Sequence, residues 1–398
     1  MPLRTALIGL SSSATTSWAS SAHLPFLLSP RGQTLFTITA LCNSTVEAAR
    51  SAIKTYNLDP STKAYENPED LANDSEIDFV ICVTRVDTHL STIKPSLQKG
   101  KSVFVEWPIA STLSDIEEIV SIVNSNNSNN SNNSTKDDKG KEKQLVAVGL
   151  QGRFAPPVLK VKEVLHSGAI GRLLSSEVRM CGATIDREFL PPGLKYFAQK
   201  SVGGNVVSIG FAHVIDFIQS VTGDILPGSE NVQFALQRPD IRIRDPRTKD
   251  IIETVKSDVP DLISVHGSLP ESEHAVKNAT LLATFTRGQP FPGDPALVWT
   301  LTGERGSIRL VAQSGIALQA SAYDAPVTIS VHKFKTDEVL DVPWGWSEEQ
   351  LGVPVAGRSV MRCLIGVGEG DGEGYVSLEE GVKRARQVFG WLDGWRGV

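Results

Sequence analysis

The chain has 398 residues, of which 40% are hydrophobic and 21% are charged, a composition that suits two or three domains with sizeable cores. Its formal net charge of −6 gives no sign of the excess of basic residues that proteins use to bind nucleic acid or anionic membranes. None of the four cysteines lies in a C-x-x-C pair, and no apolar run reaches the roughly 18 residues of a membrane helix. These features argue against zinc, redox-motif and membrane-spanning proteins and favour a reduced, intracellular protein.

The first 150 residues alternate short apolar runs with amphipathic stretches. The apolar runs, each a predicted β-strand, lie at 5–10, 35–43, 77–84, 101–106 and 145–150. Amphipathic stretches at 45–58 and 88–100 are predicted helices. Apolar strands separated by helices are typical of a parallel sheet covered on both faces. The sequence therefore predicts a doubly wound α/β domain of the Rossmann type over residues 1–150.

Residues 124–143 interrupt this domain between its fourth and fifth predicted strands. Their sequence is NSNNSNNSNNSTKDDKGKEK, which holds almost no side chain that could be buried in a core. We therefore predict a disordered surface insertion. The mixed charges at its end indicate a solvated linker rather than a binding patch.

The pattern changes after residue 150, and strands dominate most of the remaining chain. An amphipathic helix is predicted at 156–168. Period-two alternation then predicts strands at 262–269, 279–286 and 307–312. A last helix begins with the capping-box pattern of Ser377 and Glu380. Residues 151–398 are thus predicted to form an α+β domain with a large, mostly antiparallel open sheet and a C-terminal helix that returns to the body.

The turn after the first predicted strand reads Gly9-Leu-Ser-Ser-Ser-Ala14. In a dinucleotide-binding fold this turn carries G-x-G-x-x-G, whose glycines let the backbone approach the pyrophosphate at a helix N-terminus. Here the other two glycine positions hold Ser11 and Ala14, which are both small. We predict that Gly9, Ser11, Ser12 and Ala14 contact a dinucleotide, although a plain strand–helix turn would explain the stretch as well.

The second predicted strand ends at Asn43, where an NAD-binding fold usually places the acid that holds the ribose hydroxyls. An asparagine can hydrogen-bond a ribose, but it carries no charge that would repel a 2′-phosphate. The sequence therefore leaves both NAD and NADP open as the cofactor.

Several motifs together resemble the Gfo/Idh/MocA family of oxidoreductases. Thr84 and His89 match both ends of the family's T-P-x-x-x-H segment, and KGKSVFVEWPIA matches its A-G-K-x-V-x-x-E-K-P except that Trp107 replaces the lysine. The Q-x-R-F segment recurs at 151–154, and the G-G-G…D…H-x-x-D helix is similar to residues 203–223. The resemblance spans most of the chain, and it implies that Thr84, His89, Glu106 and Trp107 lie beside the cofactor. Glu106 would pack near the nicotinamide ribose, or would merely compensate a helix N-terminus.

A narrower resemblance concerns the fungal galactose-pathway co-repressor subgroup of this family, whose members bind a dinucleotide but act as regulators. SWASSAHLPFL (Ser17–Leu27), FVEW and LQGR are similar to that subgroup's versions of these segments. The subgroup also lacks the motif lysine. The chain is therefore identified as a member of the family close to this subgroup.

The family's reaction needs a lysine, an aspartate and a histidine to handle the proton of a sugar hydroxyl. By the resemblance these positions hold Trp107, Ile209 and His213. His213 could act alone, or it could simply pack within a helix. Lys195 and Tyr196 lie on a probable loop before His213 and could also supply a proton. Their alternative interpretation is a solvated lysine and an amphipathic surface tyrosine.

Three functions remain open at this point. The first is an NAD(P)-dependent oxidoreductase that acts on a small metabolite, with no metal, no nucleic acid and no membrane involved. The second is a non-catalytic regulator that binds NAD(P) and a protein partner. The third is a degenerate fold that binds no dinucleotide. The resemblance also implies a homodimer formed through the open sheet, and a cytoplasmic location, or a nuclear one for a regulator.

Overall fold

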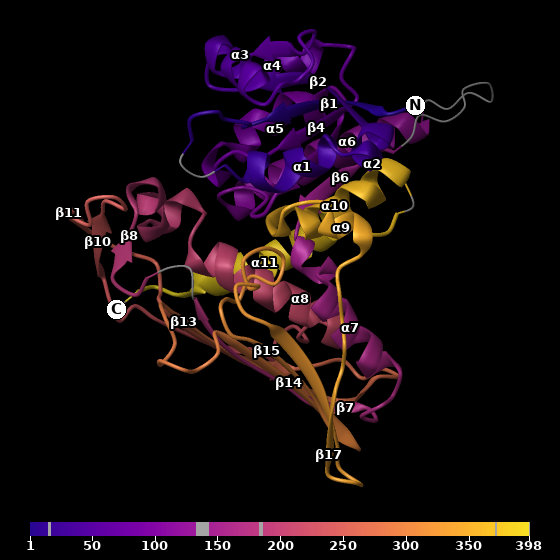
Figure 1. Ribbon diagram of the computed structural model, residues 1–398, viewed down its shortest axis with the longest axis vertical. Helices are drawn as coiled ribbons and strands as arrows, with labels where there is room; N and C mark the ends of the chain where they lie inside the picture. Colours follow the sequence, from indigo (N-terminus) through magenta and orange to yellow (C-terminus); the bar gives the residue numbers. More distant parts are fainter. Residues whose placement is uncertain (15–16, 133–142, 183–185, 371, 398) are drawn as a thin grey trace. The chain divides into compact units, whose positions relative to one another are not determined.

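The computed structural model describes residues 1–14, 17–132, 143–182, 186–370 and 372–397. These residues form two compact units (Figure 1). Unit 1 consists of Met1–Leu150, Ser201–Gly204 and Val360–Gln387, and unit 2 consists of Gln151–Lys200, Asn205–Ser359 and Val388–Val398. Residues 360–387 were predicted with the second domain, and this assignment is wrong, because they pack into the first unit.

Unit 1 contains a sheet with the strand order β18-β6-β5-β4-β1-β2-β3 in the described part of the chain. Its strands are β1 (Leu3–Ile8), β2 (Phe36–Cys42), β3 (Lys63–Tyr65), β4 (Phe79–Cys82), β5 (Ser102–Glu106), β6 (Val146–Gly149) and β18 (Val376–Ser377). All neighbours pair in parallel except β18, which pairs antiparallel with β6. The predicted Rossmann-type domain is confirmed, with β3 and β18 as additions at the two edges.

Helical segments connect the strands of unit 1. They are η1 (Ala19–His23), α1 (Leu24–Leu27), α2 (Pro30–Leu35), α3 (Val46–Thr55), α4 (Pro68–Asn73), η2 (Val86–Thr88), α5 (His89–Gln98), α6 (Leu113–Asn132), α10 (Val355–Glu369) and α11 (Leu378–Gly394). The η1 segment is a π-helix, with turns wider than those of an α-helix. Thr45 caps α3 by accepting the Ala48 N–H, as expected for a helix start after a strand.

Helix α6 corrects the prediction of a disordered insertion at 124–143. Residues 124–132 continue the helix, and residues 133–142 lie outside the described part of the chain. The Asn126 amide donates to the Leu97 carbonyl oxygen at 2.7 Å, and Asn127 Oδ1 accepts the Gln144 N–H at 2.9 Å. The first asparagines of the run therefore have backbone partners, which composition alone did not indicate.

Unit 2 is built on a sheet with the order β17-β16-β15-β14-β7-β13-β12-β9 among the described residues. Its strands are β7 (Leu173–Gly182), β9 (Asn231–Ala235), β12 (Leu262–Ser268), β13 (Ala275–Arg287), β14 (Leu297–Gly303), β15 (Gly306–Ala312), β16 (Val327–Lys333) and β17 (Glu338–Asp341). Only the pair β7 and β13 is parallel within the described part of this sheet. The predicted open, mostly antiparallel sheet is confirmed.

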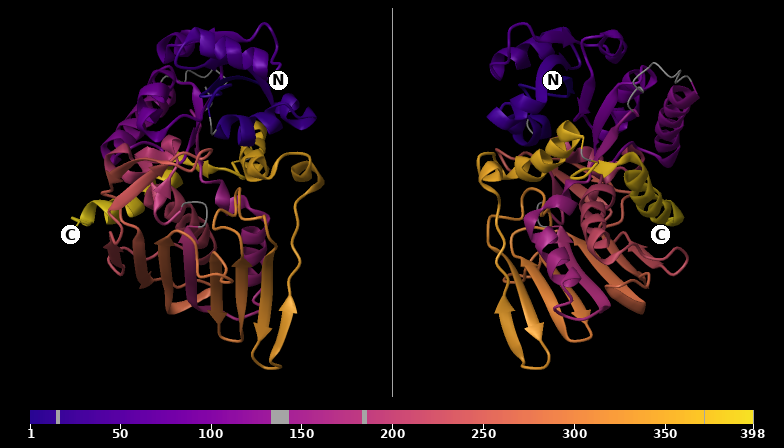
Figure 2. Two further views of the ribbon diagram at one scale, coloured as in Figure 1. Left: turned by 60° about the vertical axis from the view of Figure 1, so that its left-hand side comes forward. Right: turned by 90° about the vertical axis from the view of Figure 1, so that its right-hand side faces the viewer.

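Helices α7 (Pro156–His166) and α8 (Ala212–Thr222) lie against one face of this sheet (Figure 2). Phe217 of α8 packs against the fully buried Trp299 of β14, with ring centroids 6.0 Å apart. A smaller sheet joins β8 (Phe189–Leu190), β10 (Asp240–Arg244) and β11 (Ile251–Lys256). The remaining short helical segments are η3 (Gln151–Phe154), η4 (Pro192–Ala198), η5 (Lys200–Val202), η6 (Val206–Phe211) and α9 (Glu348–Leu351).

Candidate functional site

The residues predicted to bind a cofactor lie at the carboxyl ends of four neighbouring strands of unit 1. Because β1 lies between β2 and β4, the strand order reverses at this edge, and such switch points are where open α/β sheets bind ligands. We call the ends of β1, β2, β4 and β5 the carboxyl-edge corner. Topology therefore brings the predicted cofactor residues to one edge of one sheet.

The turn after β1 is built around Gly9 and Ser11. Gly9 has a φ of 96°, and a Cβ there would lie 2.6 Å from the Val83 carbonyl oxygen, so a larger residue does not fit. Ser11 Oγ accepts the N–H groups of Ser13 (3.2 Å) and Ala14 (3.1 Å). Two backbone donors thus converge on one acceptor, which is the arrangement that an anion can take over. The Ser12 hydroxyl lies 3.0 Å from that of Ser51, at the exposed side of the turn.

Asn43 stabilises the same turn, the one that follows β1. Its side-chain amide donates to the Leu10 carbonyl oxygen at 2.8 Å, and its backbone N–H donates to the Tyr65 carbonyl oxygen at 3.1 Å. The hydroxyl of Tyr56 donates to the Ser11 carbonyl oxygen at 2.8 Å. The Asn43 side-chain amide therefore holds the backbone of this turn, and its contact with a ribose stays a prediction.

His89 joins the loops that follow β4 and β5. Its Nδ1 lies 2.9 Å from the Pro108 carbonyl oxygen, and its Nε2 lies 3.0 Å from the Thr84 carbonyl oxygen. The side chain is only 1% exposed, and burial lowers the pKa of His89 despite these two carbonyl contacts. Thr84 Oγ1 accepts the Thr88 hydroxyl at 2.9 Å. His89 thus acts as a brace inside the corner, and the structure gives it no exposed ring face for a ligand.

Glu106 ends β5 and is 8% exposed. Its Oε1 accepts the indole N–H of Trp18 at 3.0 Å and lies 2.6 Å from Nε2 of the fully buried His23. The wide π-turn of η1 brings residues five apart in sequence to one carboxylate oxygen. A Cβ on Gly149, at the end of β6, would lie 2.5 Å from Glu106 Oε2, so that glycine leaves room for the carboxylate.

Sequence reasoning missed the roles of Trp18 and His23. Both lie in the stretch Ser17–Leu27, which was noted only for its resemblance to the co-repressor subgroup. The sequence predicts these contacts only if residues 19–23 are known to form a π-helix. In an α-helix, two side chains five residues apart would point in different directions and could not both reach Glu106.

Trp107 follows Glu106 and is 5% exposed, and its peptide bond to Pro108 is cis. An indole donates one hydrogen bond and carries no exchangeable charge near neutral pH. The position that the family pattern gives to a lysine is therefore neutral here.

His213 lies in the first turn of α8 in unit 2 and is 8% exposed. The segment before it, η6, is a π-helix capped by Asn205, whose side chain accepts the N–H groups of Val207 and Ser208, while Ser208 Oγ accepts the Asn205 N–H. Ile209 lies one turn before His213. This cap fixes the start of the helical run that carries the histidine.

Asp216, one turn after His213, is engaged by Arg153 of η3. Two guanidinium nitrogens of Arg153 each lie 2.8 Å from one of the carboxylate oxygens, and the aspartate is buried. Such a planar two-bond pair is geometrically specific. The Q-x-R-F and H-x-x-D motifs of the sequence thus meet in one structural ion pair.

Lys195 and Tyr196 lie in η4, also in unit 2. Both carboxylate oxygens of Glu253 accept from the Lys195 ammonium group at 2.8 Å, and the lysine side chain is 44% exposed. Tyr196 packs edge-to-face on Phe197 with ring centroids 4.9 Å apart. A catalytic role for Lys195 and Tyr196 stays a prediction, beside the alternative of a solvated lysine and an amphipathic surface tyrosine.

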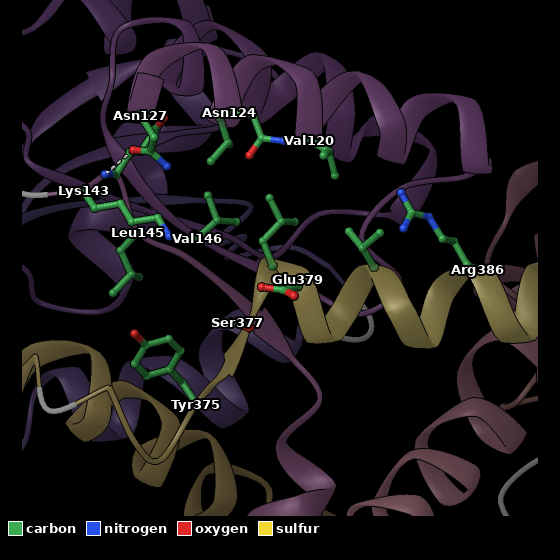
Figure 3. Close-up of a pocket in the computed structure, with 14 residues that line it drawn as sticks. Val120, Asn124, Asn127, Lys143, Leu145, Val146, Tyr375, Ser377, Glu379 and Arg386 are labelled. Carbon is green, nitrogen blue, oxygen red and sulfur yellow. Dashed lines mark hydrogen bonds between the residues drawn. The ribbon is translucent and has the colours of Figure 1, made fainter. Parts of the chain in front are cut away.

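A pocket of about 550 Å³ lies elsewhere in unit 1, between α6, the start of β6 and α11 (Figure 3). Val120 and Asn124 of α6 face Glu379 and Arg386 of α11 across it. Arg386 also forms a two-bond ion pair with Glu117, at 2.8 and 3.0 Å. None of the predicted cofactor or catalytic residues lines this pocket, so it is separate from the carboxyl-edge corner.

Two family models match the chain. Residues 3–133 match the oxidoreductase family with an NAD-binding Rossmann fold, and residues 156–312 match the C-terminal domain of Gal80p. Dehydrogenase aclE of Aspergillus oryzae is 26% identical over 390 residues, which cover 97% of this chain and 94% of that protein. The galactose/lactose metabolism regulatory protein GAL80 of Saccharomyces cerevisiae is 27% identical over 323 residues, which cover 79% of this chain and 68% of that protein.

Solved structures show the same fold. A super-repressor mutant of Gal80p from Saccharomyces cerevisiae superposes with a TM-score of 0.80 at 20% identity, over 99% of this chain and 97% of that chain. Levoglucosan dehydrogenase, solved in complex with NADH and L-sorbose, gives a TM-score of 0.70 at 17% identity, over 98% and 96% of the two chains. In the described residues, no helix is long and apolar enough to cross a membrane. Residues 3–133 are therefore similar to the Gfo/Idh/MocA oxidoreductase family, and residues 156–312 are similar to the C-terminal domain of Gal80p.

Proposed function

We propose that the chain is an NAD(P)-dependent oxidoreductase that acts on a small metabolite. The observation that carries this proposal is the similarity to Dehydrogenase aclE over nearly the whole length of both proteins. The carboxyl-edge corner fits the cofactor for two reasons. Gly9 has no side chain that would keep a ligand away from the backbone of the first turn, and two backbone N–H groups converge beside it. When bound, the dinucleotide supplies or accepts the hydride. The site residues hold it and handle the proton.

His213 is the proposed proton donor or acceptor at the substrate oxygen. The positions of the family's lysine and aspartate hold Trp107 and Ile209, and neither side chain exchanges a proton near neutral pH. An imidazole does. A reaction that needs little base catalysis, such as the reduction of an activated or conjugated carbonyl or of an imine, would suit this site.

The test is a panel of carbonyl, enone and imine substrates given to the purified chain with NADH and with NADPH. We expect cofactor oxidation with at least one class, and a loss of about 10²-fold in kcat/KM for His213→Gln. His266→Gln is the matched control, and we expect it to retain most of the activity because His266 is an exposed histidine of β12. An inactive wild-type chain across the whole panel would count against the enzyme.

The second candidate is a non-catalytic regulator that binds NAD(P) and a protein partner. The match of residues 156–312 to the Gal80p C-terminal domain favours it. For this function we expect the chain to retain a transcription activator in a pull-down from nuclear extract, with retention that changes when NAD(P) is added. A chain that binds dinucleotide but retains no such partner would contradict this candidate, and a chain that binds no dinucleotide would contradict both.

Homodimerisation and location remain proposals that accompany these functions. The sheet face of unit 2 opposite α7 and α8 presents Glu177, Thr300 and Arg309 as cross-strand neighbours, a polar surface that could meet its own copy. Light scattering after size-exclusion chromatography should give a dimer mass, which Arg309→Glu should reduce. A cytoplasmic location suits the enzyme, and a nuclear location suits the regulator.

A further inference from the structure

The Glu106 carboxylate is held in place by two ring N–H donors from one π-turn. Trp18 Nε1 and His23 Nε2 lie 3.0 and 2.6 Å from the same oxygen, Oε1. An indole nitrogen can only donate, so Oε1 accepts that bond. His23 and Glu106 are buried and Trp18 is partly buried, so the position of the carboxylate is fixed before any ligand arrives.

The hydrogen bonds also indicate which ring nitrogen of His23 carries the hydrogen. Nδ1 of His23 is buried and has no hydrogen-bond partner among the described residues. A proton on Nδ1 would be an unsatisfied buried donor, which is costly, so the hydrogen of a neutral ring belongs on Nε2. His23 then donates to Glu106, and two donors on one oxygen stabilise the carboxylate anion.

The neighbouring side chain adds no positive charge. The Glu-Lys pair of the family pattern is Glu106 and Trp107 here, so this pair of residues carries a net negative charge instead of none. The substitution therefore alters the field of the corner as well as its proton chemistry.

The position of Glu106 places this charge on the nicotinamide side. Each half of a doubly wound sheet holds one mononucleotide, and the half from β1 to β3 carries the Gly9 turn and Asn43, which serve the adenosine side. Glu106 ends β5, in the other half. This step rests on the proposed binding of a dinucleotide.

We propose that the fixed Glu106 carboxylate, with Trp18 and His23 as its positioning residues, makes the corner select the oxidised dinucleotide over the reduced one. The oxidised nicotinamide ring carries a positive charge, and the reduced ring is neutral, so only the oxidised form gains attraction from the carboxylate. By linkage, a dinucleotide that is reduced on the protein is held less tightly and is a stronger hydride donor. A regulator with this corner would respond to the redox state of the pool.

The experiment measures the dissociation constants of NAD⁺, NADH, NADP⁺ and NADPH for the full chain by calorimetry. In the wild-type chain we expect the oxidised form to bind about tenfold more tightly than the reduced form. Glu106→Gln keeps an oxygen that accepts both ring donors, and we expect it to remove most of this preference. Glu117→Gln is the control, because Glu117 is an exposed carboxylate of the same unit that pairs with Arg386, and it should leave the preference unchanged.

A second variant keeps the test informative where Glu106→Gln fails to fold. Trp18→Phe removes one donor and keeps an aromatic ring, and we expect it to reduce the preference by about two- to threefold. Equal affinity for both redox forms in the wild-type chain, or a preference that neither variant changes, would overturn the inference and leave the proposed dinucleotide binding intact. Failure to bind any of the four dinucleotides would remove the proposed function, and the inference with it.

Discussion

Trp107, which follows β5, and His89, which begins α5, serve different purposes in the corner. Trp107 stands where the family pattern has its lysine, and it is almost completely buried. His89 matches the family pattern, yet both of its ring nitrogens lie on backbone carbonyl oxygens. The matched residue thus supports the loops, while the replaced residue is the one whose substitution tests the proposed chemistry.

Replacing Trp107 by lysine should restore alcohol dehydrogenation if the rest of the site is intact. The new amine would lie beside the Glu106 carboxylate and could exchange a proton with a substrate hydroxyl. We expect an increase of about 10²-fold in the oxidation of a polyol panel with NAD⁺ or NADP⁺. Trp107→Phe is the control and should give no increase. A similar rise in both variants would show that removing the indole, rather than adding the amine, is responsible.

His89 should make folding stability depend on pH. Because burial lowers the pKa of His89 in the folded chain, the unfolded chain binds a proton that the folded chain does not bind below the ordinary value of about 6.5. The free energy of unfolding should therefore fall between pH 7 and pH 5, and His89→Gln should weaken this fall. Urea midpoints at pH 7, 6 and 5 measure it, with the exposed His266→Gln as control. Identical slopes in all three proteins would contradict the prediction.

At the scale of elements, two π-helical segments introduce important side chains. The η1 segment directs Trp18 and His23 to Glu106, and η6 leads into the helix of His213. Both are local widenings of a helix, and such features are frequent at functional sites. The cap at Asn205 holds the second of them, because it satisfies two backbone donors that a helix start would otherwise leave without partners.

Asn205→Ala should destabilise unit 2 by about 1 kcal/mol, since two backbone N–H groups in a buried setting lose their acceptor. Urea unfolding followed by tryptophan fluorescence measures the change. Ser347→Ala, which removes the cap of the short, exposed α9, should cost much less. Equal losses in the two variants would show that burial of the cap does not matter.

The buried parallel strands and the open sheet could be predicted because their apolar patterns are long enough to show a period. The edge strands β3 and β18 could not, since Lys63–Tyr65 and Val376–Ser377 are too short to show a pattern. The contacts of Glu106 depend on the π-turn, and those of Lys195 depend on Glu253, which is distant in sequence. The sequence thus predicts where the corner lies, but it does not predict the hydrogen-bond and ion-pair partners of Glu106 and Lys195.

At the scale of the whole molecule, unit 1 is assembled from segments that are far apart in the sequence, chiefly Met1–Leu150 and Val360–Gln387. Strand β18 pairs with β6, and α11 packs so closely on that strand that a Cβ on Gly381 would lie 2.8 Å from a Val148 side-chain atom. Gly368 of α10 is similarly close to Leu35, and Arg31 pairs with Glu369. The nucleotide-binding fold therefore includes residues 360–387 as part of its core.

A chain that ends at Ser359 should lack a stable unit 1, because it exposes the surface that α10, β18 and α11 cover. We expect it to lose dinucleotide binding and the cooperative thermal transition of unit 1. A chain that ends at Trp395 retains α11 and serves as the control. Full NADH binding by the shorter chain would show that the first 150 residues fold without the C-terminal segment.

The pairing of β18 with β6 also sets the order of events during synthesis. Domains usually fold as they leave the ribosome, beginning at the N-terminus. Here the sheet of unit 1 keeps an open edge at β6 until residues 376–377 have emerged, more than 200 residues after β6 itself. Between the synthesis of β6 and that of β18, this edge is open to pairing with other chains. The pairing of β18 with β6 ends this exposure.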